Sequence, residues 1–257
     1  MELYFCISLQ RSGNTLLGSI LNQNPDITFT ANSPLTEIIY QLDLIKNQKD
    51  LKLSQHQNFP HNESLENVIR KTFYTYSETF KTKYVINRAN WGSDGNLELL
   101  EKYFDKKIKF LIIYRDPLEC LASLLKAYKV KKEDSETAAD HYMNIETGTL
   151  GNAISQIPFI RKNYEHLFIT YDQLIANPKN TANSIYDFFN IPKFKHTYKN
   201  LKQFEIQGVQ YDDSIFGDVD LHTIRTDKIE KKTYAIEDFL LPSVIEKYQN
   251  IGKNYES

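Results

Sequence analysis

The sequence predicts an α/β protein in which a parallel β-sheet is flanked by helices. Strand-like runs alternate with helix-like runs along the chain, as in parallel α/β sheets. The apolar run at residues 107–114 (KIKFLIIY) is nearly continuous, which is typical of a strand buried on both faces of a sheet. Because the 257 residues show no internal repeat and no linker rich in Pro, Gly or Ser, residues 1–257 are predicted to form one domain.

Four strands and the helices between them can be placed in chain order. Strands are expected at residues 3–9, 84–87, 107–114 and 166–170. Helices are expected at residues 16–23, 34–46, 63–80, 97–104, 117–125, 178–190 and 236–248, with a helical stretch at 131–163 that breaks near 148–151. Ser33-Pro34 is a typical helix start, and Asn24-Pro25 ends the first helix. Residues 47–62 are read as a loop, and the chain from about 195 as irregular.

Composition excludes several classes of protein. Lys plus Arg is 31 and Asp plus Glu is 33, so a generally basic nucleic-acid binder is not indicated, although a local basic pocket is compatible. No apolar run approaches the roughly 20 residues of a membrane span. The first residues lack the basic region of an export signal, so we expect a cytoplasmic protein. Cys6 and Cys120 both lie in apolar runs, which fits free thiols in a reducing compartment.

The loop after the first strand is the first feature that carries chemistry. A strand, a Gly-bearing loop and a helix direct backbone N–H groups and the positive end of the helix dipole at one point, which favours a phosphate or sulfate group. Gly13 allows close backbone approach. Side-chain donors are supplied by Ser12, Asn14 and Thr15. The lysine of the nucleotide-binding P-loop is missing and Arg11 precedes the glycine, which disfavours magnesium–ATP chemistry. The alternative is a purely structural turn.

A second polar group follows the most strand-like run, in the string RDPLECLAS. Arg115 lies at the carboxyl end of this strand, where ligands of open α/β sheets bind, and Ser123 lies about two helical turns further on. The planar guanidinium fork matches phosphate oxygens, and a nearby hydroxyl adds a donor. The segment therefore predicts a second phosphate site, with an arginine in a salt bridge at the strand end as the alternative.

Three segments taken together resemble the sulfotransferases that use 3′-phosphoadenosine 5′-phosphosulfate (PAPS). LQRSGNTLLGSILNQNPDI resembles their 5′-phosphosulfate-binding loop, and YRDPLECLASLLKAY resembles their 3′-phosphate-binding segment, with arginine and serine at the family's spacing. FITYDQLIANPKNTANSIYDFFNIP resembles their aromatic-rich closing segment. The matches cover residues 3–33, 84–128 and 167–192 in the family's order, so chance is a poor explanation. The arginine in the loop is more similar to the bacterial and tyrosylprotein branches than to the cytosolic branch.

The resemblance implies a P-loop-like fold without a metal and PAPS as the sulfuryl donor. It assigns the 5′-phosphosulfate to Arg11, Ser12, Gly13, Asn14 and Thr15. Arg115 and Ser123 are expected to hold the 3′-phosphate, while Tyr171 either packs near the adenine or lines the pocket, or else belongs to the core. The acceptor is a hydroxyl or amine of a small molecule, glycan or peptide, and variable loops leave its identity and the oligomeric state open.

The catalytic residues are only partly matched by the resemblance. Arg11 is expected to stabilise charge on the leaving phosphate oxygen. In VINRANW, Arg88 stands where tyrosylprotein sulfotransferases carry a lysine, so it is a candidate second cation or else an exposed arginine. Their catalytic glutamate is replaced here by Asn32. The candidate general bases are Glu37, one turn further along, which we prefer, and His222 in LHTIR, because the cytosolic branch uses a histidine.

Two other classes of function stay open at this point. One is a nucleotide-binding or kinase-like P-loop protein in which Arg11 replaces the usual lysine. The other is a degenerate sulfotransferase fold used only for binding, which the missing glutamate motivates. The histidines and cysteines show no metal-ligand spacing, so no metal site is expected. No aromatic motif for stacking nucleic acid bases is present in the sequence, so no nucleic-acid partner is expected.

Overall fold

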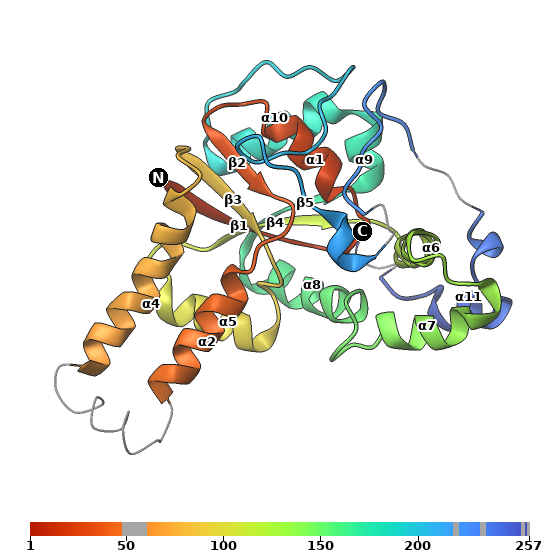
Figure 1. Cartoon of the computed structure of the whole chain (residues 1–257), viewed down its shortest axis with the longest axis horizontal. Helices are drawn as coiled ribbons and strands as arrows, with labels where there is room; N and C mark the ends of the chain where they lie inside the picture. The colour runs from red at the N-terminus through yellow and green to blue at the C-terminus, as the bar shows by residue number, and fades with distance from the viewer. Residues whose placement is uncertain (48–60, 218–220, 232–234, 253–254, 256–257) are drawn as a thin grey trace.

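Five parallel strands form one sheet in the order β2-β3-β1-β4-β5 (Figure 1). The computed structural model describes residues 1–47, 61–217, 221–231, 235–252 and 255. The strands are β1 (Glu2–Ser8), β2 (Ile27–Thr30), β3 (Tyr84–Arg88), β4 (Lys109–Tyr114) and β5 (Glu165–Thr170). The predicted class, a parallel α/β sheet flanked by helices, is confirmed.

Helices cover both faces of this sheet. The α-helices are α1 (Asn14–Leu21), α2 (Leu35–Asn47), α4 (His61–Glu78), α5 (Asp94–Tyr103), α6 (Pro117–Ala127), α7 (Ser135–Tyr142), α8 (Gly151–Asn163), α9 (Tyr171–Ala176), α10 (Pro178–Phe189) and α11 (Pro242–Tyr248). Short 3-10 helices are η2 (Lys132–Asp134), η3 (Asp213–Phe216) and η4 (Ile236–Asp238). In Figure 1, α1, α9 and α10 lie on one side of the sheet, and α5 and α8 on the other.

The structure corrects the sequence-based prediction at three places. The strand β2 was missed, because four residues directly after the turn at Asn24-Pro25 are too short to show a period. The helix expected at 236–248 is split into η4 and α11, since Pro242 starts a new helix. The break in the 131–163 stretch is longer than expected and spans 143–150. The predicted loop at 47–62 lies mostly outside the described residues.

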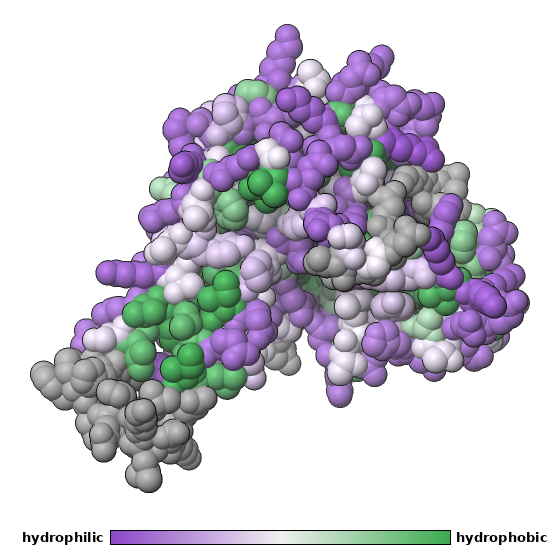
Figure 2. Space-filling view, viewed as in Figure 1, coloured by the Kyte–Doolittle hydropathy of each residue, from purple (hydrophilic) through white to green (hydrophobic). Residues whose placement is uncertain are grey.

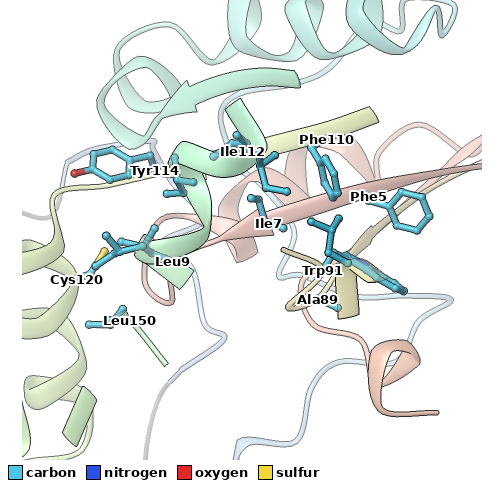
Figure 3. Close-up of a cluster of buried hydrophobic side chains, with 14 of the residues drawn as sticks. Phe5, Ile7, Leu9, Ala89, Trp91, Phe110, Ile112, Tyr114, Cys120 and Leu150 are labelled. Atoms are coloured by element: carbon cyan, nitrogen blue, oxygen red, sulfur yellow. The ribbon is translucent and has the colours of Figure 1, made fainter. Parts of the chain in front are cut away.

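The buried strands divide the core into two layers. Along β1, Phe5 and Ile7 belong to one hydrophobic cluster and Cys6 to the other, as the two-residue period of a strand requires. Figure 3 shows the first cluster, where the Phe5 ring packs edge-to-face on Trp91 with ring centroids 4.9 Å apart. Both cysteines, Cys6 and Cys120, are free, and burial raises the pKa of each thiol to about 12. The packing within the two hydrophobic clusters holds the strands in place, and the ends of these strands carry polar side chains.

The pair α2 and α4 projects away from the sheet (Figure 1). Its exposed large apolar side chains are Tyr40, Leu44, Ile45 and Val68. A green, hydrophobic area lies over these helices at the lower left of Figure 2. In the part of the chain that the structure describes, no helix is both long enough and apolar enough to cross a membrane.

Candidate functional site

The loop between β1 and α1 is closed by hydrogen bonds to the carbonyl oxygen of Leu9. The Ser12 hydroxyl donates to it at 2.7 Å and the Asn14 amide at 3.2 Å. Ser12 is fully buried and is absent from the lining of the neighbouring cavity, so its side chain holds the turn together. Asn14 and Thr15, which begin α1, do line a cavity of about 220 Å³, which we call the main cavity. The first N–H groups of α1 lack partners within the helix and are available there.

Gly13 allows this turn to lie against α9. Its φ is +99°, and a Cβ atom built on it would lie 2.8 Å from Cδ2 of Tyr171. Arg11 also has a positive φ, 65°, which an arginine seldom adopts. Tyr171 is buried and still lines the main cavity, so it is both a core residue and a wall of the site. The sequence left these two roles as alternatives.

The two predicted phosphate-binding segments meet in this cavity. The Arg11 Nε donates to the Ser123 hydroxyl at 3.2 Å, and Arg115 Nη1 donates to the Arg11 carbonyl at 3.1 Å. Arg115 is buried, with its Nε 2.9 Å from a carboxylate oxygen of Glu119 and its guanidinium carbon 4.4 Å from the centre of the Tyr171 ring. Residues more than 100 positions apart in the sequence therefore form one hydrogen-bonded group.

Arg88 ends β3 beside the end of β1. Its Nε donates to the Ser8 hydroxyl at 2.9 Å, its Nη2 to the Ser8 carbonyl at 3.1 Å, and its Nη1 to the Asn32 side chain at 3.4 Å. Burial lowers the pKa of this guanidinium below its usual value. Arg88 lines the main cavity, so it is not merely an exposed arginine that follows a strand.

The C-terminal segment 221–231 covers the main cavity and brings His222 into it. The Leu221 carbonyl accepts a hydrogen bond from Arg11 Nη1 at 2.6 Å. The Asp213 carboxylate accepts from the backbone N–H groups of Leu221 and His222 and lies 2.5 Å from Nδ1 of the His222 ring. Burial alone would raise the pKa of Asp213, but these hydrogen bonds from His222 and the backbone hold it below its usual value. With Nδ1 engaged, Nε2 is the nitrogen left to take a proton.

Tyr211 connects this histidine to Asn32. Its ring stacks on the His222 ring with centroids 4.5 Å apart. Its hydroxyl donates to the Asn32 carbonyl at 2.8 Å and accepts from the Asn32 N–H at 3.1 Å. His222 is thereby held in the same cavity as Asn32 and Arg88.

Glu37, the preferred base, is not brought to this site. It is exposed on α2, accepts a hydrogen bond from Gln41 at 2.6 Å and does not line the main cavity. The buried face of α2 carries Leu35 and Ile39. Glu37 lies two residues from each of them, which places it about 200° around the helix from Leu35. This spacing was readable in the sequence.

The main cavity is strongly cationic. Among the described residues that line it, the charged side chains are Arg11, Arg88, Arg115, Arg225, Lys228 and Glu230. Glu230 lies 2.5 Å from Lys228 Nζ and 3.6 Å from Arg225, so it offsets part of that charge. Sequence reasoning missed Asp213, Lys228 and Glu230, because the irregular C-terminal segment has no period to place them. In the described residues no group of three or more His, Cys, Asp or Glu side chains could hold a metal ion.

Comparison with known proteins identifies the class. The model of the sulfotransferase family matches residues 4–196, so the chain belongs to the sulfotransferase family. The reaction of this family is the transfer of a sulfuryl group, which excludes the alternative of a kinase-like P-loop protein. A search of the curated proteins found no match.

Solved structures show the same fold at low sequence identity. The sulfotransferase domain of the Synechococcus PCC 7002 olefin synthase is 15% identical, with a TM-score of 0.53, and the match covers 96% of this chain and 94% of that one. Mouse sulfotransferase SULT7A1, solved with 3′-phosphoadenosine 5′-phosphate (PAP), is 13% identical, with a TM-score of 0.53 and coverages of 98% and 84%. Sulfotransferase STF9 from Mycobacterium avium is 11% identical, with a TM-score of 0.52 and coverages of 98% and 75%.

Proposed function

We propose that this sulfotransferase takes the sulfuryl group from PAPS, releases PAP and uses His222 as its general base. The observation that carries the donor assignment is the joining of the two phosphate-binding segments by Arg11, Ser123 and Arg115 in one cationic cavity. A donor with phosphates at both the 3′ and 5′ positions matches this charge, because fixed guanidinium groups bind phosphate and sulfate oxygens in pairs. The mouse neighbour solved with PAP agrees with this donor.

In this proposal the cations have separate tasks. Arg115 and Ser123 hold the 3′-phosphate, and Gly13, Asn14 and Thr15 hold the 5′-phosphosulfate at the start of α1. Arg11 bonds to Ser123 in this structure, so donor binding exchanges that contact for a sulfonate or phosphate oxygen. The thiols of both cysteines are buried and unpaired, which supports the predicted cytoplasmic location.

The transfer step needs a base for the acceptor proton. The acceptor oxygen attacks sulfur, the S–O bond to the 5′-phosphate breaks, and the electron pair of that bond goes to the phosphate oxygen. Arg11 and Arg88 stabilise the charge that develops there, because they are positioned before the reaction begins. His222 Nε2 takes the acceptor proton, and the Asp213 carboxylate stabilises the resulting imidazolium through Nδ1.

A thermal-shift comparison tests the donor directly. At a PAP concentration of 100 times its dissociation constant, binding stabilises the folded chain by about 2.7 kcal/mol, which raises Tm by roughly 5–10 °C for a chain of this length. ATP with magnesium is expected to give a much smaller shift. A larger shift with magnesium–ATP than with PAP contradicts the proposed donor. PAP binding without turnover on any acceptor instead supports a fold used only for binding.

A further inference from the structure

A second cavity opens beside the main one. It has a volume of about 290 Å³, and it shares Gln10, Asn32 and Arg88 with the main cavity. Its outer wall is the 146–149 loop and the start of α8, and the Thr149 hydroxyl donates to the Gln10 side chain at 3.3 Å. We call it the amide cavity, because five carboxamide side chains line it. A group bound there lies next to Arg88, one of the two cations proposed to act on the sulfuryl group.

Three carboxamides in this cavity form an ordered network. Asn90 Nδ2 donates to the Asn152 oxygen at 3.0 Å, and Gln156 Nε2 donates to the oxygens of Asn90 at 2.9 Å and Asn152 at 2.5 Å. Gln156 is 6% exposed and packs so closely on Gly92 that a Cβ there would lie 2.6 Å from its oxygen. The network is therefore held in one arrangement before any acceptor arrives.

The loop that closes this cavity is also fixed. The Asn144 side chain accepts from the N–H groups of Glu146 and Thr147 at 2.9 and 3.0 Å. Asn152 Nδ2 donates to the Glu146 carbonyl at 3.3 Å. A Cβ on Gly148 would lie 2.5 Å from a backbone carbonyl, so the loop packs tightly on the end of α7. Its hydroxyl and carboxylate side chains are thus presented to the cavity by a rigid support.

The side chains lining this cavity favour a particular class of acceptor. A carboxamide both donates and accepts hydrogen bonds, as does a hydroxyl, so the lining complements a molecule with several neighbouring hydroxyl groups. Within the described part of the chain, no aromatic side chain lines the amide cavity. Its apolar side chains are one isoleucine and two alanines: Ile7, Ala89 and Ala153. An apolar ring there would cover carboxamides without bonding to them, which is costly.

We propose that the amide cavity is the acceptor site and that it takes a neutral, polyhydroxylated molecule of the sugar or cyclitol type. This inference rests on the proposed sulfuryl transfer from PAPS. The reacting hydroxyl lies at the junction formed by Gln10, Asn32 and Arg88, and the carboxamides bind the neighbouring hydroxyls. The acceptor gains an O–S bond and gives its proton to His222 Nε2, while the leaving phosphate oxygen takes the electron pair of the broken S–O bond. Glu146, which lines the cavity, disfavours an anionic acceptor.

Competing acceptors test the substrate class. The full chain is incubated with PAPS and with methyl α-glucoside, N-acetylglucosamine, myo-inositol or 4-nitrophenol, and sulfated product is measured by mass spectrometry. At least one polyol is expected to have a kcat/KM about 100-fold or more above that of the phenol, because a site built for hydroxyls rejects ligands that lack them. Sulfation of the phenol but of no polyol overturns the inference while leaving the donor assignment intact. PAP binding with no sulfated polyol also overturns it.

A variant series tests the cavity itself. Asn90→Ala and Thr149→Val are expected to raise KM for the preferred polyol about tenfold each, with kcat and PAP binding nearly unchanged, because they remove ground-state hydrogen bonds. Asn163→Ala is the matched control, since this exposed amide at the end of α8 bonds only to the Phe159 carbonyl in the described hydrogen bonds. If neither cavity variant changes KM, the amide cavity is not the acceptor site. The same conclusion follows if both variants instead weaken the binding of PAP. Failure of wild-type PAP binding would contradict the proposed function itself.

Discussion

Replacing Asp213 by Asn tests the proposed base through its partner. The Asp213 carboxylate bonds to the His222 ring at 2.5 Å and to two backbone N–H groups at 2.9 Å each. An Asn side chain keeps one oxygen for the backbone, so the 221–222 segment stays in place. Its NH₂ group, however, can donate to Nδ1, which moves the ring proton to Nε2. The nitrogen that should accept the substrate proton is then already protonated.

The structure sets the size of this effect. The lost contact is a hydrogen bond to a charged group, worth about 1.5–3 kcal/mol, and the side chains of Asp213 and His222 are only 16% and 21% exposed, so water screens it little. If the full amount is lost in the transition state, kcat falls by roughly 10- to 150-fold, since each 1.36 kcal/mol is a factor of ten. PAP affinity is expected to stay within about twofold, because the carboxylate is not proposed to touch the donor.

The assay is steady-state sulfation with PAPS in excess, together with calorimetric titration of PAP. Asp212→Asn is the control, because this exposed neighbour bonds to Ser214 rather than to the histidine. His222→Ala is expected to lower kcat by roughly 10²-fold or more. Unchanged kcat in both Asp213→Asn and His222→Ala would refute the proposed base.

Substitutions at four further positions test the donor site and the rejected base. Arg115→Ala should weaken the binding of PAP by roughly 1.5–3 kcal/mol more than the binding of adenosine 5′-phosphosulfate, as measured by calorimetry. Equal losses of binding free energy for the two ligands contradict the 3′-phosphate assignment. Arg11→Ala should lower kcat more than it lowers the affinity for the donor, and Arg11→Lys should keep part of the rate. A loss of donor affinity with unchanged kcat would mean that Arg11 only positions the donor. Gly13→Ala should cost roughly 1–3 kcal/mol in thermal unfolding, because φ is +99° and Tyr171 is close; an unchanged Tm refutes this. Glu37→Gln should leave turnover unchanged, as its exposed position requires.

The meeting of the two segments proposed to bind the donor could be predicted from the sequence, because local patterns place both of them. An apolar strand followed by a Gly-bearing loop and a helix needs no tertiary information, and Arg115 directly follows the most strand-like run. The carboxyl ends of parallel strands meet at one edge of a sheet, so the two segments are expected to lie close together. What the pattern did not contain was the direct bond between Arg11 and Ser123, which depends on the positive φ of Arg11.

The C-terminal side could not be predicted in the same way. Arg11 and Leu221 are 210 residues apart, and the segment between 195 and 231 has no helical or strand period to place its side chains. Asp213 and His222 are brought together by a 3-10 turn and by two backbone hydrogen bonds, none of which leaves a spacing signature. Glu37 was preferred because it lies close to Asn32 in the sequence. Its position on α2, however, places it on the side of the helix opposite the buried residues.

The amide at Asn32 and the Asp213–His222 pair are best understood together. A glutamate at position 32 would lie beside Arg88, whose Nη1 already contacts the Asn32 oxygen at 3.4 Å, and would neutralise one of the cations proposed to act on the sulfuryl group. An amide there keeps the charge of Arg88 available. In the proposed mechanism, His222 removes the proton from a different segment of the chain, and Tyr211 bonds to the Asn32 backbone while its ring stacks on His222. Tyr211→Leu should therefore lower kcat with little effect on PAP affinity, whereas Tyr211→Phe, which keeps the ring, should retain more activity. If the two variants lose kcat equally, the hydroxyl bond to Asn32 rather than the stacked ring positions the base.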